Sequence, residues 1–210
     1  MDGQMLGKKS LSGLSYLLYL PPGYDQGKEI PLLLFLHGSG ERGNDLELLK
    51  KYGPPAIAAK EDFPCIILAP QCPRNDHWHS EQLDELLEEV LEEVNADRNS
   101  VYVSGVSMGG YGCWELAMYV PEKFAAVVPV CGGGNPDQVH RLKPVPVWAF
   151  HGAKDEIVPL DASRLMVEGL NRAGGNVRFT IYPDAGHDSW TSAYGEKELY
   201  RWMFESKKMT

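Results

Sequence analysis

A serine lies between two glycines at a point where a strand is expected to end and a helix to begin. The stretch reads Gly105-Val106-Ser107-Met108-Gly109, which has the spacing G-x-S-x-G. Residues 101–104 have the composition of a buried strand, and residues 108–119 are typical of a helix. Such a turn strains the serine backbone and exposes its hydroxyl, while the flanking glycines give the chain room to turn. The spacing therefore predicts Ser107 as a nucleophile.

A serine hydroxyl needs a general base within hydrogen-bond reach, and six histidines are candidates. His187 lies in a flexible turn between the last predicted strand and the last predicted helix, at the carboxyl ends of the strands. We expect His37 and His151, which each close a strand, to be structural, and His140 to lie in a solvated loop. His187 is therefore the predicted base.

The base in turn needs an acid that fixes its tautomer and stabilises the imidazolium. Asp155 follows the predicted strand 145–151 by a short turn, from which a carboxylate can reach across to the turn after the next strand. The alternatives are Glu156, Asp184 and Asp188. The two aspartates of this set lie so close to the base in sequence that they could simply hold its loop. Asp155 is therefore the predicted acid.

An oxyanion that develops at the substrate needs hydrogen-bond donors. Met108 follows the serine and offers one backbone N–H at the start of the expected helix. A second donor is expected from the loop His37–Gly43, where three glycines let the main chain approach a substrate closely. No G-K-[ST] sequence follows, so this loop is not predicted to bind phosphate.

A second loop, residues 70–81, mixes aromatic and polar side chains beside the expected strand ends. It carries Gln71, Trp78 and the pair His77 and His79, which are separated by one residue. The pair could contribute to a metal site, but no third ligand has a recognisable spacing. We therefore predict no metal and no cofactor.

Charge and hydropathy limit the classes of partner. The 210 residues include 20 basic and 29 acidic side chains, a net charge of −9, which argues against nucleic acid or an anionic membrane. Much of the acid falls in residues 81–93, where it forms the solvated face of an expected amphipathic helix. No signal peptide or membrane-spanning run is visible, so we expect a cytoplasmic protein. Four cysteines show no C-x-x-C spacing, and nothing in the sequence supports a Cys65–Cys72 bridge.

Apolar strand-like runs alternate with helix-like segments. The expected strands are 16–20, 31–37, 64–70, 100–104, 125–131, 145–151 and 177–182, and the expected helices are about 46–60, 81–96, 108–120, 160–174 and 190–204. This alternation predicts an α/β fold, a mostly parallel sheet of about seven strands with helices on both faces. Residues 1–210 are expected to form a single domain without a lid, since the connection 131–145 is short. The first two strands are expected to pair as an antiparallel edge hairpin.

Four segments together resemble the α/β-hydrolase superfamily: Leu36–Gly43, Gly105–Gly110, His151–Pro159 and Gly186–Trp190. The order of serine, aspartate and histidine along the chain is that of α/β-hydrolases. More narrowly, the segments are similar to the phospholipase/carboxylesterase and predicted-peptidase branch, which includes feruloyl-esterase-like members. The resemblance runs from about Tyr16 to the C-terminus.

The resemblance implies roles for particular residues. They are the nucleophile Ser107, the base His187, the acid Asp155, the oxyanion donors Met108 and Ser39 with Gly40 as an alternative, and the pocket residues Gln71 and Trp78. No lid insertion and no N-terminal accessory domain of the kind some relatives carry is visible. This leaves the substrate open.

The predicted function is a serine carboxylic-ester hydrolase that cleaves small esters through an acyl-enzyme. Esters of short or aryl acids are expected, because Trp78 and Trp190 offer flat apolar walls, although Trp190 could equally pack in the core. The nearest alternative is a serine peptidase or amidase on the same fold. Alternatives of other classes are a non-catalytic binding protein that kept the fold and a metal-dependent hydrolase built on His77 and His79. Only a small-molecule ester is predicted as a partner, and the sequence does not define an oligomeric state.

Overall fold

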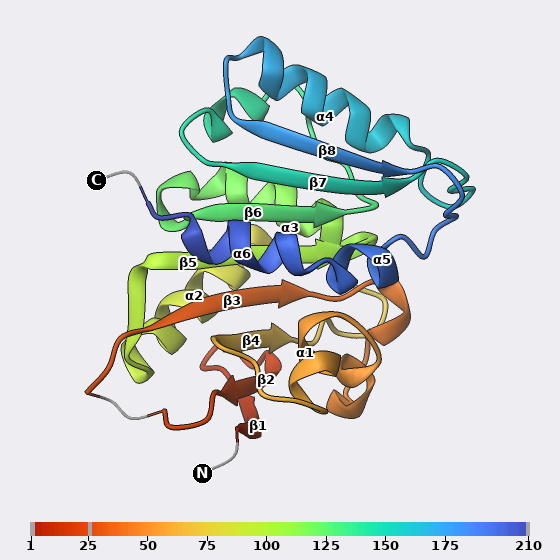
Figure 1. Cartoon of the computed structure of the whole chain (residues 1–210). Helices are drawn as coiled ribbons and strands as arrows, with labels where there is room; N and C mark the ends of the chain where they lie inside the picture. The colour runs from red at the N-terminus through yellow and green to blue at the C-terminus, as the bar shows by residue number, and fades with distance from the viewer. Residues whose placement is uncertain (1–2, 25–26, 209–210) are drawn as a thin grey trace.

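The computed structural model describes residues 3–24 and 27–208 (Figure 1). Within them, eight strands form one sheet in the order β1-β2-β4-β3-β5-β6-β7-β8. The strands are β1 Gln4–Lys9, β2 Ser15–Leu20, β3 Ile30–Leu36, β4 Ile66–Pro70, β5 Ala96–Val106, β6 Ala126–Val130, β7 Val147–Gly152 and β8 Val177–Tyr182. β2 pairs antiparallel with β1 and β4, and the pairs from β4 through β8 are parallel.

Helices cover both faces of this sheet (Figure 1). The α-helices of the described residues are α1 Gly53–Ala58, α2 Ser80–Glu93, α3 Met108–Tyr119, α4 Asp161–Arg172, α5 Trp190–Gly195 and α6 Lys197–Glu205. Short 3₁₀ helices lie at Ser39–Glu41, Leu46–Lys50, Pro121–Lys123 and Val139–Leu142. Side chains of α2, α3 and α4 pack into one core cluster, and those of α1, α5 and α6 pack into a second cluster on the opposite face.

The central strands contribute to both clusters. In β3, Leu32, Leu34 and Leu36 enter the cluster under α2, α3 and α4, while Leu33 and Phe35 enter the other. A strand that is buried on both faces needs apolar side chains at successive positions. This is why the buried strands appear in the sequence as continuous apolar runs.

The mostly parallel sheet with helices on both faces agrees with the sequence prediction of about seven strands. The additional strand is β1, which was not predicted because it is largely exposed and has no apolar run. Two further details of the prediction are wrong. β4 lies between β2 and β3, so the first two predicted strands do not form an edge hairpin. The segment 46–60 is divided into a 3₁₀ helix and α1, because Gly53 adopts a φ of +69° and is followed by two prolines.

Three further features bear on the predictions. All four cysteines are buried and free, so Cys65 and Cys72 form no disulfide. Among the described helices, none has the length and the apolar character needed to cross a bilayer. The connection from β6 to β7 holds a single 3₁₀ turn, Val139–Leu142, in agreement with the expected absence of a lid at this position.

Candidate active site

Ser107 lies in a strained turn between β5 and α3. Its backbone has φ +54° and ψ −118°, a combination that is costly for a residue with a side chain. The N–H of Ser107 donates to the carbonyl of Val130 on β6 at 3.0 Å, which holds the turn against the sheet. A Cβ on Gly105 would collide with the carbonyl of Gly109, and one on Gly109 with the carbonyl of Leu36. The two glycines of the G-x-S-x-G pattern are therefore sterically required.

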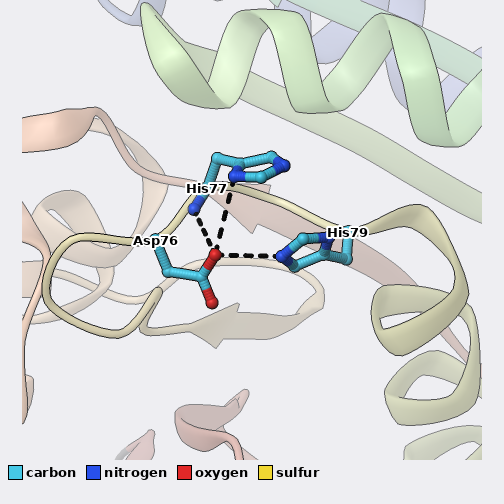
Figure 2. A group of neighbouring side chains, drawn as sticks. All are labelled: Asp76, His77 and His79. Atoms are coloured by element: carbon cyan, nitrogen blue, oxygen red, sulfur yellow. Dashed lines mark hydrogen bonds and ion pairs between the residues drawn. The ribbon is translucent and has the colours of Figure 1, made fainter.

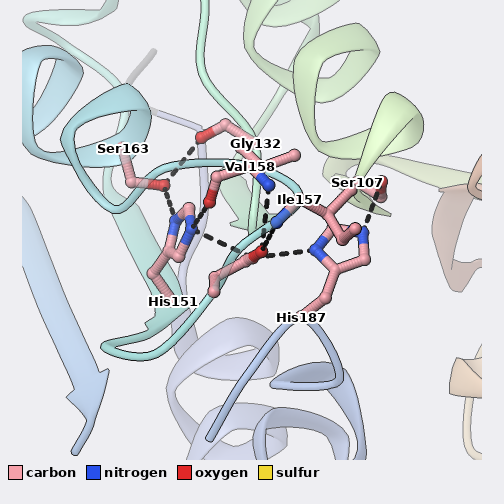
Figure 3. Close-up of polar contacts among 8 residues, drawn as sticks. Ser107, Gly132, His151, Ile157, Val158, Ser163 and His187 are labelled. Carbon is pink, nitrogen blue, oxygen red and sulfur yellow. Dashed lines mark hydrogen bonds and ion pairs between the residues drawn. The ribbon is translucent and has the colours of Figure 1, made fainter.

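The ring of His187, from another loop, meets this serine (Figure 3). Nε2 of His187 lies 2.9 Å from Oγ of Ser107, and Nδ1 of the same ring lies 2.8 Å from Oδ2 of Asp155. With Nδ1–H donating to the carboxylate, Nε2 is left as an acceptor for the serine proton. The structure thus brings together the three residues that the sequence predicts as nucleophile, base and acid.

The Asp155 carboxylate is kept ionised in a buried position. Its side chain is fully buried, and burial alone would raise its pKa. The hydrogen bond from His187 and those from the backbone N–H groups of Val158 and Ile157, each at 2.9 Å, outweigh burial and hold this pKa below its ordinary value. An anion at this point can orient the neighbouring imidazole and stabilise the imidazolium formed during a reaction.

The loops that carry the acid and the base are joined by backbone hydrogen bonds. The N–H of Ala153 donates to Tyr182 at 2.9 Å, and that of Lys154 donates to Ala185 at 2.9 Å. Two of the three alternative acids are engaged elsewhere: Asp184 pairs with the Lys154 side chain at the surface, and Asp188 accepts from the N–H of Thr191 in α5.

The glycine-rich loop after β3 lies over the serine. A Cβ on Gly38 would stand 3.6 Å from Cβ of Ser107. The Gly38 N–H donates to the hydroxyl of Tyr52 at 3.0 Å, and that hydroxyl donates to the carboxylate of Glu41. Burial, followed by the bond to Glu41, raises the pKa of Tyr52, so this hydroxyl stays protonated. The next residues, Ser39 and Gly40, are exposed.

Tyr52 and Glu41 were not expected at this site. Tyr52 lies well beyond the loop His37–Gly43 in the sequence. Its contact with this loop depends on how the 3₁₀ helix Leu46–Lys50 directs the chain. Glu41 is buried and lies within the loop itself. Because a buried carboxylate needs a hydrogen-bond donor, burial of Glu41 would have indicated a partner such as Tyr52. The sequence of this polar, glycine-rich loop does not show that Glu41 is buried.

Two of the expected pocket residues serve the framework instead. Gln71 is 1% exposed, and its amide donates to the carbonyls of Glu41 and Asp45, both at 2.8 Å. Trp78 is 5% exposed, belongs to the core cluster, and donates from its indole N–H to His37 O at 3.2 Å. The expectation that these side chains line a substrate pocket is therefore wrong, because the loop turns them inward.

Trp190, the third expected pocket residue, is half-buried beside the base. Its ring packs edge-on against the ring of His187, with centroids 5.3 Å apart, and lies 5.3 Å from the ring of Tyr52. Both Trp190 and Tyr52 line a hollow of about 410 Å³ between α1 and α5. Ile57 and Tyr194 add apolar surface to this hollow, and Lys60 adds a positive charge.

His37, at the end of β3, and His140, in a loop, both bond to parts of the chain outside the relay. His37 is buried: its Nδ1 donates to Gly38 O at 2.5 Å and its Nε2 accepts from the N–H of Cys72 at 2.9 Å. Burial lowers its pKa to about 4, so the ring stays neutral. His140 is exposed and bonds the carbonyl of Asp137.

The sheet order, the turn at Ser107 and the loops around it are those of an α/β-hydrolase. Residues 71–197 match the dienelactone hydrolase family, and the chain, more than half of which this match covers, belongs to that family. This agrees with the superfamily predicted from the sequence.

Esterases are among the relatives and the solved structures that the chain resembles. The chain is 27% identical over 168 residues to a probable feruloyl esterase C of Aspergillus terreus, covering 74% of this chain and 60% of that protein. It is 25% identical over 222 residues to an uncharacterized secreted protein of Arthroderma benhamiae, of which it covers 23%. The crystal structure of a thermostable esterase superimposes with a TM-score of 0.86 at 34% identity, over 99% of this chain and 64% of that one. The chain thus spans less than two thirds of the length of these relatives.

Proposed function

We propose that this protein is a serine carboxylic-ester hydrolase that works through an acyl-enzyme on small esters. The observation that carries the proposal is the unbroken relay from Ser107 Oγ through His187 to the buried Asp155 carboxylate, at 2.9 Å and 2.8 Å. The esterases among its relatives support the same reaction class.

In the proposed reaction, Ser107 Oγ attacks the ester carbonyl while Nε2 of His187 takes its proton. Asp155 holds the imidazolium that forms. The alcohol leaves with that proton, and a water molecule then cleaves the acyl-enzyme by the same route. The net change is hydrolysis of one ester to an acid and an alcohol.

The proposed oxyanion donors are the backbone N–H groups of Met108 and Ser39, with Gly40 as the alternative. Met108 is the first residue of α3, where helix N–H groups have no partner within the helix. Gly38 is unsuited to this task, since its N–H is already bonded to Tyr52. This bond instead supports a role for Tyr52 in holding the loop so that the following N–H can face the substrate.

The proposed substrates are esters of short or aromatic acids. The support is the hollow between α1 and α5, with the aromatic rings of Tyr52, Trp190 and Tyr194 among its walls. A feruloyl esterase is the relative whose name agrees with an aromatic acid. A single-domain organisation and a cytoplasmic location stay predictions, and cell fractionation of the native host would test the location, since one relative is described as secreted.

A fluorophosphonate probe tests the proposal directly, because it forms a stable adduct with an activated serine. We expect mass spectrometry to locate the adduct on Ser107, and Ser107→Ala to abolish both labelling and hydrolysis of p-nitrophenyl acetate. Asp155→Asn should lower kcat by roughly 10²–10⁴, since the histidine loses its orientation. Ser12→Ala, at an exposed serine in the β1–β2 turn, is the matched control. Adduct formation at another serine would overturn the assignment.

A further inference from the structure

Three side chains of the loop before α2 converge outside the Ser107 site (Figure 2). Oδ1 of Asp76 lies 2.9 Å from Nε2 of His79 and 3.5 Å from Nδ1 of His77. One potential ligand atom from each residue lies within 4.8 Å of the others. The sequence alone indicated no third ligand for the pair His77 and His79, and Asp76 is a candidate for that position. It directly precedes the pair, in the sequence Asp-His-Trp-His.

From this geometry we propose that Asp76, His77 and His79 form a binding site for a divalent transition-metal ion such as Zn²⁺. Two imidazoles and one carboxylate are a ligand set that zinc accepts, with remaining positions open to water. A tetrahedral ion with bonds of about 2.0 Å holds its ligand atoms about 3.3 Å apart. The two distances to the carboxylate oxygen, 2.9 Å and 3.5 Å, lie on either side of that value.

The loop that presents these ligands is held by its surroundings. Trp78, between the two histidines, is buried and bonded to His37, whereas His77 and His79 on either side of it are exposed. The guanidinium of Arg42 donates to the backbone carbonyl of Asp76 at 2.9 Å, and the backbone N–H of His77 donates to the Asp76 carboxylate at 2.8 Å. A site whose backbone is fixed in this way loses less conformational entropy when an ion binds.

Two acidic side chains lie beside the histidine pair. His77 and His79 line a hollow of about 400 Å³ whose wall also includes Glu81 and Glu115, and no lysine or arginine is among its described lining residues.

The proposed ion would stabilise the loop that carries Asp76, His77 and His79. This loop is connected through Arg42 to the glycine-rich loop beside Ser107. Arg42 donates to Asp76 O and also, from Nε, to Ser39 O at 3.0 Å. The loop that carries Asp76 and the glycine-rich loop after β3 therefore both accept hydrogen bonds from the guanidinium of Arg42. The ion is not expected to touch the substrate, so its effect should appear in stability rather than in the chemical step.

A zinc titration of the EDTA-treated full chain by calorimetry tests the proposal. We expect one site in the wild type, weakened about tenfold or more in each of His77→Ala, His79→Asn and Asp76→Asn. His140→Ala removes an exposed histidine outside the cluster and should bind zinc as the wild type does. At free zinc a hundredfold above the dissociation constant, the melting temperature should rise by about 5–10 °C.

A competing site must be separated from this one, because Cys131, Asp155 and His187 also lie within ligand distance of one another. His187→Ala should leave zinc binding unchanged if the proposal holds. Bound Cu²⁺ should show hyperfine coupling to two imidazole nitrogens by EPR, lost in the His77→Ala/His79→Asn double variant. Absence of zinc binding in the wild type, undiminished binding in the loop variants, or loss of binding in His187→Ala would each overturn the proposal without bearing on ester hydrolysis.

Discussion

Nε2 of His151 lies 3.3 Å from Oδ2 of Asp155, the same carboxylate oxygen that Nδ1 of His187 approaches to 2.8 Å (Figure 3). The His151 side chain is fully buried, and its Nε2 also lies 2.9 Å from the carbonyl of Val158. Both neighbours of this nitrogen are acceptors, so Nε2 carries a hydrogen. The acid of the relay therefore stands between two imidazoles, only one of which reaches the serine.

The other nitrogen of His151 faces a hydroxyl with a single proton. Nδ1 lies 2.7 Å from Oγ of Ser163, which lies 2.7 Å from the carbonyl of Gly132. If Ser163 donates this proton to Nδ1, the His151 ring is neutral. If Ser163 donates it to the Gly132 carbonyl instead, Nδ1 must carry a hydrogen in addition to Nε2, and the ring is a cation. Burial lowers the pKa of His151, which favours the neutral ring with its hydrogen directed at Asp155 and Val158. His151 is thus placed to hold the carboxylate in position.

Replacing His151 should impair turnover more than binding. A hydrogen bond to a charged group contributes roughly 1.5–3 kcal/mol, which corresponds to about 10- to 150-fold in rate if it is lost in the transition state. We expect His151→Ala to lower kcat within this range with KM little changed, and His151→Gln, which keeps a donor, to recover part of the loss. Steady-state kinetics with p-nitrophenyl acetate checks this. Equal kcat values for the two variants and the wild type would exclude a positioning role.

The sequence supplied the parts of this site that depend on local chain geometry. The strained turn at Ser107 needs particular glycines, and the acid and base follow strands whose apolar runs are easily recognised. Contacts that depend on the packing of distant segments were missed. Tyr52 reaches Gly38 only because a 3₁₀ helix returns the chain to the loop. Trp78 was misassigned because a polar loop does not show which of its residues turns inward.

Stability should fall on acidification before most carboxylates titrate. Burial lowers the pKa of His37 to about 4, below the ordinary value of 6.5, and also lowers that of His151. Between pH 6.5 and 4 the unfolded chain binds a proton at His37, whereas this ring stays neutral in the folded chain. The free energy of unfolding therefore falls with pH by up to about 1.4 kcal/mol per unit for this group. Below the folded pKa the contribution becomes constant.

Urea unfolding at pH 7, 6, 5 and 4 measures this slope. His37→Asn should flatten it, because the titrating group is gone while a short polar side chain remains at the position. His140→Gln, which changes an exposed histidine, should leave the slope as it is. A free energy of unfolding that stays constant from pH 6.5 to 4 in the wild type would contradict the burial argument.

Tyr52→Phe should disturb the glycine-rich loop. Loss of the hydroxyl leaves the Gly38 N–H and the buried Glu41 carboxylate without this partner, at a cost of roughly 1–3 kcal/mol in stability. We expect a lower kcat for ester hydrolysis as well, because the N–H of Ser39 would be less well positioned. The double variant Tyr52→Phe/Glu41→Gln should lose less stability than the two single changes added together, since one bond joins the two residues. Additive effects in the thermodynamic cycle would show that the two residues act separately.

Trp190 should determine which acid the enzyme accepts. Its ring contacts the His187 ring and also lines the hollow with Tyr52 and Ile57, so we expect an acyl group on Ser107 that extends toward α1 to contact it. A flat apolar wall suits an aromatic ring or a short chain better than a long flexible one. We expect kcat/KM to be highest for soluble esters of aryl acids or of acids with about two to four carbons, and to fall for chains of about ten carbons or more.

Trp190→Ala should reduce the preference for aryl over acetyl esters while the melting temperature changes little. Trp78→Ala is the matched control: it empties a core position, should cost about 3–5 kcal/mol in stability, and should leave the preference intact. A substrate profile that follows Trp78 rather than Trp190 would place the acyl group on the other side of the serine.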